Sequence, residues 1–356
     1  MTSTPPPDAS RTRLRVAGAI ALLVAVAVLG GLVGGLLARG DRAGGSPTAS
    51  VCRAISVAAD GLPSVVTISA RNGARSGTGS GVIISSEGYI LTNNHVISLA
   101  ADGGRVAVRL DDGRAFATVI VGRDPDTDLA VLKTKDGGEL QPIRLATSTG
   151  VQVGQPVVAL GAPQGLASTV TSGIISALDR NLPIPGDEDN ESAQLVGAIQ
   201  TDASINPGNS GGALVDCSAR LIGINTAIIT VANAAGVSGG GSVGLGFAIP
   251  VDLAMRLADE IIATGRVTHP TFGLETQAQS PGPGLLVTAV APGGPGARAG
   301  LRAGDTITAL DGVAVTSPDA LVVATLTRSA GDLVEVSYRR GTGPIAKLDV
   351  VLEAQP

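Results

Sequence analysis

Three side chains in this sequence could together activate a nucleophile. Ser210 is flanked by glycines, His95 follows a short apolar segment, and Asp128 closes an Asp-Thr-Asp turn. A serine hydroxyl is a poor nucleophile at neutral pH unless an imidazole accepts its proton and a carboxylate orients that imidazole. We therefore take Ser210, His95 and Asp128 as the candidate catalytic residues, which follow one another in the order His, Asp, Ser.

Each of these residues also has an ordinary structural explanation when it is considered alone. A serine between glycines is usually a turn, a histidine after a strand is usually a satisfied surface or core residue, and an aspartate often ends a loop. Their joint occurrence in this order favours the catalytic interpretation. The other histidine, His269, lies in a Thr-His-Pro segment that is typical of a linker, so His95 is the candidate general base.

The glycines around the serine predict an oxyanion hole. A tight turn over Gly208, Asn209 and Ser210 can aim consecutive backbone N–H groups at one point outside the chain. A side chain at Gly211 or Gly212 would crowd this turn. The turn could therefore stabilise the negative charge that develops on a substrate carbonyl oxygen.

The composition predicts a mainly β protein that does not bind nucleic acid. Hydrophobic residues make up 44% of the chain but aromatic residues only 1%, so the core must consist of Val, Leu, Ile and Ala, and branched side chains favour strands. The 25 basic and 30 acidic residues give a net charge of −5 without any long basic tract, which excludes a nucleic-acid partner. No group of His, Cys and carboxylates has metal-ligand spacing, so we expect neither a metal nor another cofactor.

Short branched runs separated by turn residues predict a series of hairpins. The expected strands are 64–69, 82–85, 89–92, 106–110, 115–121, 129–134, 156–162 and 171–177. This spacing favours barrels or a sandwich over a parallel sheet with intervening helices. His95 and Asp128 fall in the N-terminal half and Ser210 in the C-terminal half, so a cleft between two barrels would bring them together.

The N-terminal region predicts a membrane span. Residues 16–38 lack charged and polar side chains, and as a helix of about 23 residues they would extend roughly 34 Å, enough to cross a bilayer core of about 30 Å. Arginines before this run place residues 1–15 in the cytoplasm and the rest of the chain outside. A cleaved signal peptide is the alternative, because residues 38–40 form a small-x-small triplet. Residues 39–54 are typical of a flexible linker.

Two cysteines, Cys52 and Cys217, would both lie outside the membrane in this topology. An exported compartment permits a disulfide between them. Two free thiols are the alternative, because the sequence does not give the separation of the two residues.

Four motifs together resemble the HtrA (Deg) family of trypsin-like serine proteases, in its membrane-anchored bacterial form. They are TNNHV at 92–96, DLAVLK at 128–133, GNSGG at 208–212 and GFAIP at 246–250. The resemblance implies a chymotrypsin-like double β-barrel protease domain over 55–253, a helical linker over 254–270 and an α+β PDZ domain over 271–354. It also implies a homo-oligomer, a trimer in many relatives, although residues 40–70 lack the aromatic side chains that often mediate such contacts.

The resemblance also predicts the specificity and control of the enzyme. Ser204 stands where chymotrypsin-like proteases have the base of the substrate pocket, and without an acid there a preference for Arg or Lys is not expected. Ile205 and the strand 244–249 should line a small apolar pocket that accepts Val, Ala or Ile. Asn209 replaces the Asp that pairs with a newly cut N-terminus in digestive relatives, so control by the loops 179–196 and 233–242 is expected instead. Solvated surface insertions are the alternative for both loops.

The C-terminal segment resembles a bacterial PDZ domain. Phe272, Gly273 and Leu274 should offer N–H groups to the terminal carboxylate of a peptide that adds as a strand. Apolar periodicity predicts a helix over 251–264 before this domain, and the resemblance implies helices over 297–301 and 318–329 with strands over 305–310 and 333–339 within it. A small β domain that only packs on the protease is the alternative.

Two hypotheses about function follow. The first is a membrane-tethered serine endopeptidase with its catalytic and PDZ domains on the extracytoplasmic side, which cleaves misfolded or signalling proteins of the cell envelope and is regulated by peptides bound to its PDZ domain. The second is a chaperone or scaffold that holds unfolded chains or exposed C-termini without obligatory proteolysis. The complete trio of Ser, His and Asp favours the first.

Overall fold

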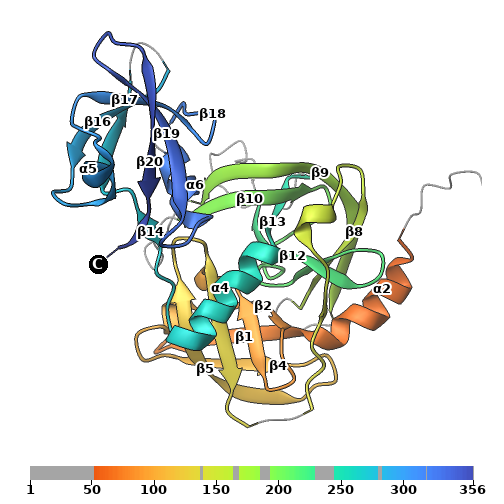
Figure 1. Ribbon diagram of the computed structural model, residues 1–356. Coiled ribbons are helices and arrows are strands. Elements are labelled where there is room, and N and C mark those ends of the chain that lie inside the picture. The colour runs from red at the N-terminus through yellow and green to blue at the C-terminus, as the bar shows by residue number, and fades with distance from the viewer. Residues whose placement is uncertain are drawn as a thin grey trace, which may run out of the picture. The chain divides into compact units, whose positions relative to one another are not determined.

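The computed structural model describes residues 52–136, 139–162, 168–184, 193–228, 244–279, 283–317 and 319–355 (Figure 1). These residues belong to one compact unit, Cys52–Pro356. The membrane span expected at 16–38 lies outside the described residues, as do residues 185–192 and 233–242 of the two expected loops. Among the residues that are described, we find no helix whose length and apolar character would suit a bilayer crossing.

Six antiparallel strands close into a barrel at the beginning of the described chain. In barrel order they are β1 (Val65–Asn72), β2 (Arg75–Ile83), β3 (Tyr89–Thr92), β6 (Leu129–Thr134), β5 (Ala115–Asp124) and β4 (Arg105–Arg109). The short helical elements around it are α2 (Ala54–Gly61), η1 (Leu62–Ser64), α3 (Asn94–Ile97) and η2 (Ser98–Ala100). Branched side chains such as Ile68, Ile83 and Ile90 fill the interior and are fully buried. Branched aliphatic residues pack well on a pleated surface, which is why a core almost without aromatics still closes.

Seven strands form the second sheet, which closes on itself because β11 pairs with β12 as well as with β8. In sheet order they are β11 (Ala213–Val215), β8 (Pro156–Gly161), β9 (Thr169–Ile184), β10 (Ala193–Thr201), β13 (Gly246–Pro250), β12 (Arg220–Ile228) and β7 (Arg144–Leu145); η3 (Ser148–Gly150) follows β7. Ile175, Ile199 and Leu214 lie in its buried interior. The mainly β architecture predicted from the composition is thereby confirmed.

The hairpin of β9 and β10 corrects one expectation. The strand predicted over 171–177 continues to Ile184, and part of the loop predicted over 179–196 is strand, because β9 ends at 184 and β10 begins at 193. Asp179 does not end the strand: its φ is 55°, and the register shifts between the pairs Ala198↔Arg180 and Gln200↔Ala177. An inserted residue at a β-bulge bends a strand without ending the ladder.

Helix α4 (Val251–Thr264) forms where the apolar periodicity predicts it and joins the two barrels. Its buried residues include Leu257, Ala258 and Ile261, and the helix contacts β5 and β6 of the first barrel and β12 and β13 of the second (Figure 1). These buried residues of α4 belong to a core cluster that also contains residues of both barrels, among them Leu91 and Leu221. This shared core fixes one barrel against the other.

The C-terminal residues form a smaller domain around a sheet in which five strands follow one another in a single order. In sheet order its strands are β15 (Leu274–Ala278), β16 (Leu285–Val290), β17 (Asp305–Leu310), β19 (Leu333–Arg340) and β20 (Ile345–Val351); β18 (Val313–Ala314) pairs with β17, and β14 (Pro270–Thr271) pairs with β21 (Glu353–Ala354). Its helices are α5 (Pro295–Ala299) and α6 (Asp319–Leu326). Helix α5 begins before its expected start at 297, because proline suits the first turn of a helix.

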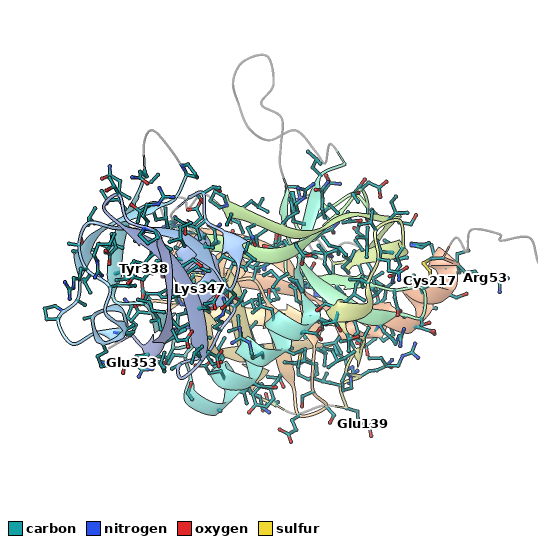
Figure 2. The ribbon with its side chains drawn as sticks, turned by 45° about the horizontal axis from the view of Figure 1, so that its top comes forward. Arg53, Glu139, Cys217, Tyr338, Lys347 and Glu353 are labelled. Atoms are coloured by element: carbon teal, nitrogen blue, oxygen red, sulfur yellow. A yellow bond between two sulfur atoms is a disulfide. The ribbon has the colours of Figure 1, made fainter. Side chains whose placement is uncertain are left out.

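A disulfide ties the first described residue to the second barrel. Cys52 and Cys217 are bonded, with a Cα–Cα distance of 4.9 Å and a sequence separation of 165 (Figure 2). Cys52 is 6% exposed and belongs to the core cluster shared by the barrels, whereas Cys217 lies in the turn between β11 and β12. The bond therefore fixes the start of α2 against the second barrel.

We expect the double variant Cys52→Ser, Cys217→Ser to lose about 2–5 kcal/mol of unfolding free energy, because a long closed loop restricts the unfolded chain. Urea unfolding without reductant measures this loss. Wild-type protein unfolded in excess dithiothreitol is the control and should approach the variant. Equal unfolding midpoints for the variant and the oxidised wild type would contradict the expectation.

Candidate active site

His95 and Asp128 meet at one end of the first barrel. His95 lies in α3 directly after β3, and Asp128 directly precedes β6, the strand that pairs with β3. The Nδ1 atom of His95 is 3.0 Å from Oδ1 and 2.9 Å from Oδ2 of Asp128. The main-chain N–H of His95 also donates to Oδ1 at 3.0 Å. The carboxylate is thus placed to fix both the orientation and the tautomer of the imidazole, whose Nε2 edge faces away from it.

Asp128 is a buried acid in an uncommon backbone conformation. Its side chain is 0% exposed and its φ is 59°, in the left-handed region that few residues other than glycine adopt. Its carbonyl oxygen accepts hydrogen bonds from the N–H of Asn94 at 3.1 Å and from Nδ2 of Asn93 at 2.9 Å. The hydroxyl of Thr226 donates to Oδ2 at 2.6 Å. The Thr226 hydroxyl and the two N–H groups of His95 offset the cost of removing the carboxylate from water, while the asparagines hold the backbone of Asp128.

Ser210 approaches this pair from the second barrel. Its hydroxyl donates to the carbonyl oxygen of Thr226 at 2.9 Å, and its own carbonyl accepts from the N–H of Ser80 at 2.8 Å. The hydroxyl of Ser80, on β2, donates to the carbonyl of Gly208 at 2.6 Å and accepts from the N–H of Ala162 at 2.8 Å. Ser80 therefore anchors the Ser210 turn to the first barrel.

Thr226 and Ser80 are the site residues that the sequence analysis missed. Thr226 contacts two of the three candidate residues, because its hydroxyl bonds to Asp128 and its carbonyl to Ser210. A weak signal for Thr226 was present in the sequence, because Asn225 and Thr226 are adjacent polar residues within an apolar segment. In the structure their exposed fractions are only 0% and 3%. Ser80 carries no comparable signal, because it occurs in a run of small residues.

The turn before Ser210 presents two of the three N–H groups predicted for the oxyanion hole. Asn209 N–H donates to the carbonyl of Asn206 at 2.9 Å, so it is used within the turn. Within the described chain, the N–H groups of Gly208 and Ser210 donate to no backbone carbonyl, which leaves them for a substrate. Glycine is required at 211, where φ is 82° and a Cβ would lie 2.1 Å from the Ser80 carbonyl.

His95 and Ser210 line a common cleft of about 290 Å³, together with Thr78, Val96, Asn206, Pro207 and Gly208. Of the predicted pocket residues, Ser204 is exposed, and its carbonyl accepts from the hydroxyl of Thr171 at 2.9 Å. Ile205 is fully buried in the core of the second barrel, where it lies under Gly246. Neither belongs to the cleft lining in the described part of the chain.

The predicted carboxylate-binding turn of the C-terminal domain lies beside an edge strand. Gly273 has φ of 65°, its N–H donates to the Thr271 hydroxyl at 3.0 Å, and its carbonyl accepts from Ala291 at 2.9 Å. Phe272 is 3% exposed, so its side chain belongs to the domain core. Strand β15, which begins at Leu274, pairs with β16 on one side and is the last strand of its sheet path in the described chain.

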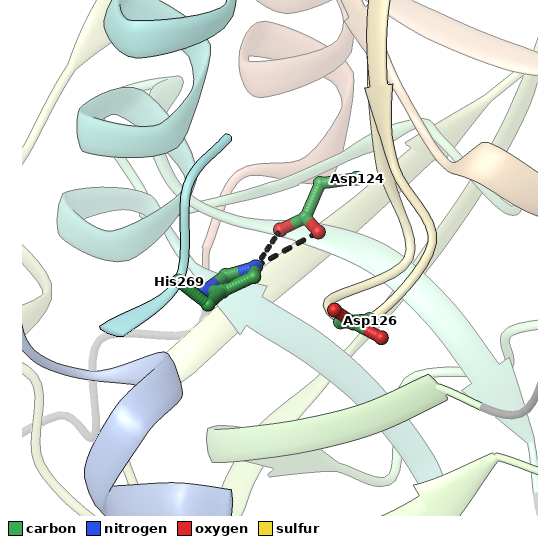
Figure 3. A group of neighbouring side chains, drawn as sticks. All are labelled: Asp124, Asp126 and His269. Carbon is green, nitrogen blue, oxygen red and sulfur yellow. Dashed lines mark hydrogen bonds and ion pairs between the residues drawn. The ribbon is translucent and has the colours of Figure 1, made fainter. Parts of the chain in front are cut away.

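His269 does not behave as a residue of a solvated linker. Its side chain is 12% exposed, and its Nε2 is 2.9 and 3.0 Å from the two carboxylate oxygens of Asp124 (Figure 3). With Asp126 these residues form the one group in the described chain whose ligand atoms, all within 4.8 Å of one another, could surround a cation. The imidazole and the Asp124 carboxylate already satisfy each other, so we assign no metal.

The surroundings of His269 favour its protonated form. Burial lowers the pKa of this imidazole, but its hydrogen bond to Asp124 and the negative charges of Asp124, Asp126 and Glu260 together outweigh burial and raise the pKa above the ordinary histidine value. When it is protonated, the imidazole forms a partly buried ion pair with Asp124.

Comparison with known proteins agrees with this geometry. Residues 79–224 match the family model of the trypsin-like peptidase domain, and residues 286–340 match that of the PDZ domain. The chain is 41% identical over 376 residues to the serine protease PepD of Mycobacterium tuberculosis, which covers 99% of this chain and 81% of PepD. It is 40% identical over 303 residues to the periplasmic pH-dependent serine endoprotease DegQ of Escherichia coli, covering 78% of this chain but only 63% of DegQ.

Solved structures give the same result. The HtrA-type protease AlgW with tripeptide superposes with a TM-score of 0.66 at 38% identity, covering 85% of this chain and 97% of that one. The serine endoprotease from Yersinia pestis superposes with a TM-score of 0.61 at 34% identity, covering 88% of this chain and 100% of that one. The chain therefore belongs to the HtrA (Deg) family of serine endopeptidases, with a trypsin-like peptidase domain followed by a PDZ domain.

Proposed function

We propose that Ser210 is the nucleophile of this endopeptidase, His95 its general acid and base, and Asp128 the anion that orients His95. The observation that supports this most is the bidentate contact of the His95 imidazole with a fully buried carboxylate, in the cleft that Ser210 also lines. An ordinary surface histidine is not paired with a buried aspartate that accepts hydrogen bonds from groups of two barrels.

The reaction follows from these positions. The hydroxyl of Ser210 rotates from the Thr226 carbonyl towards Nε2 of His95, which accepts its proton as the oxygen attacks the scissile carbonyl. The N–H groups of Gly208 and Ser210 receive the negative charge on the carbonyl oxygen. Return of the proton from His95 releases the amine, and a water activated by the same imidazole hydrolyses the acyl-enzyme.

The substrates we propose are misfolded or signalling proteins of the cell envelope, cleaved after small apolar residues. Ser204 offers no charge for Arg or Lys, and in the described chain no carboxylate lines the cleft that Ser210 and His95 share. Residues 16–38 would tether the enzyme to the membrane, with the catalytic and PDZ domains on the extracytoplasmic side. The disulfide supports this location, because disulfides persist in oxidising compartments.

Regulation by peptides at the PDZ domain is the remaining part of the proposal. Strand β15 lies at a sheet edge beside the turn of Phe272, Gly273 and Leu274, an arrangement that suits the addition of a peptide strand. The same edge would also let the domain hold unfolded chains or exposed C-termini without cleaving them, which is a second function that β15 favours.

We expect Ser210→Ala to lower kcat for an unfolded casein substrate by roughly 10⁶-fold, because loss of the nucleophile removes the covalent route. Fluorophosphonate labelling should disappear as well. Circular dichroism and the unfolding midpoint serve as controls for the fold. Casein cleavage at the wild-type rate by this variant would refute the assignment of Ser210.

Thr226→Val should lower kcat roughly ten- to hundredfold at unchanged KM, because a hydrogen bond to a charged group is worth about 1.5–3 kcal/mol. Steady-state kinetics on a fluorogenic peptide measure the change. Thr118→Val is the matched control, since Thr118 is also a buried threonine and donates to a backbone carbonyl, that of Val106, in the first barrel. If both variants keep the wild-type kcat, Thr226 does not support Asp128.

A peptide with a free C-terminal carboxylate should bind the Ser210→Ala protein at least about tenfold more tightly than its C-terminal amide, because the amide removes the charge that backbone N–H groups would receive. Fluorescence anisotropy with labelled peptides measures both affinities. Equal affinities would show that the turn of Phe272, Gly273 and Leu274 does not bind a carboxylate.

A further inference from the structure

We propose that His269 is a positioning residue for the candidate catalytic aspartate, acting through Asp124 on the turn that joins β5 to β6. The proposal rests on the proposed function, because it is Asp128 whose geometry His269 would control. His269 itself lies outside the cleft that Ser210 and His95 line in the described chain.

The turn carries two buried acids, one at each end. Asp124 is the last residue of β5 and Asp128 the residue before β6, and they are 3% and 1% exposed. Figure 3 shows the His269 imidazole directed edge-on at both carboxylate oxygens of Asp124, with Asp126 on the neighbouring part of the turn. His269 thus supplies the positive charge for the acid at the first end of the turn.

Hydrogen bonds within the turn link the Asp124 carboxylate, which His269 holds, to the residues next to Asp128. The hydroxyl of Thr127, which is 2% exposed, donates to Oδ2 of Asp124, the same carboxylate that His269 holds. The N–H of Asp128 donates to the carbonyl of Pro125 at 3.3 Å. Since Asp128 has a left-handed φ of 59°, the surrounding turn must hold it there against its intrinsic preference.

His269 is itself held by two other parts of the chain. The N–H of Thr268 donates to Oε1 of Glu260 on α4 at 2.9 Å. The carbonyl of His269 accepts from the N–H of Gln355 at 3.1 Å, and the next residue, Pro270, pairs with Ala354 of β21. The backbone at His269 is therefore fixed between α4 and the last strand of the PDZ domain, so the bond of its imidazole to Asp124 connects that domain to the turn that ends at Asp128.

The charges around His269 predict how its support of Asp128 changes with pH. Asp124, Asp126 and Glu260 face the imidazole and raise its pKa against the opposing effect of burial. A raised folded-state pKa means that the charged pair is fully present below the ordinary histidine pKa and is lost as pH rises through the raised value. The support given to Asp128 should therefore weaken towards alkaline pH.

The test compares full-length wild type with His269→Leu and His269→Gln. We expect His269→Leu to lower kcat and the fluorophosphonate labelling rate about ten- to hundredfold at unchanged KM, the size expected of a small displacement in the catalytic geometry. His269→Gln should have a rate between those of wild type and His269→Leu, because its amide N–H can still donate to Asp124 but carries no positive charge. The ratio of wild-type to His269→Leu kcat should fall as pH rises, and this ratio cancels the titration of His95, which both proteins share.

Arg340→Leu is the matched control. Arg340 also pairs with a buried carboxylate, that of Asp305, within the PDZ domain, so this variant should lose stability while keeping the wild-type kcat. Labelling is measured well below the unfolding midpoint of each variant. Ser210→Ala provides the unlabelled baseline, and labelling of that variant would refute the proposed function and leave the role of His269 a separate question.

Two results would overturn the inference. One is an unchanged kcat and labelling rate in His269→Leu, with only a lower unfolding midpoint, which would make the pair purely structural. The other is a loss of wild-type activity on dialysis against EDTA that zinc restores, which would show that a cation, and not the imidazolium, holds Asp124. A pH-independent kcat ratio would contradict the role of charge in the same way.

Discussion

Burial of the Asp128 carboxylate is the constraint on which the active site depends. A charged group without water is stable only when donors surround it. Asp128 obtains them from the His95 imidazole and backbone on one side and from the Thr226 hydroxyl on the other. Because Thr226 belongs to the second barrel, the two barrels must dock correctly before the acid is satisfied, and correct docking also brings Ser210 into the cleft.

The docking itself relies on small residues and branched aliphatic side chains. Ser80 bonds to the backbone on both sides of the Ser210 turn, and this requires an approach so close that Gly211 has no room for a Cβ. Gly79 is similarly confined, since a Cβ there would lie 2.6 Å from a methyl of Val96. Helix α4 and the shared core then hold the barrels together at a distance from the reactive groups.

The sequence predicted what depends on local pattern. Residues 129–134 begin with a short apolar run and residues 251–264 repeat their apolar residues at helical spacing, and β6 and α4 have those bounds. The order of His95, Asp128 and Ser210 with their glycines was enough to nominate the site. Thr226, Ser80 and the His269–Asp124 pair were missed, because each depends on a partner far away in sequence that only the folded chain brings near. The continuation of β9 past Asp179 was missed because a bulge conceals the strand pattern.

The disulfide has a mechanical consequence for a chain that is held from its N-terminal side. Covalent bonds transmit tension, and the bond between Cys52 and Cys217, which have a sequence separation of 165, bypasses the chain between them. A pull applied between the N-terminus and the PDZ domain would run from Cys52 directly to Cys217 and onward through β12. His95, Asp128 and Ser210, the candidate catalytic residues, all lie in the bypassed stretch and therefore outside the path of the force.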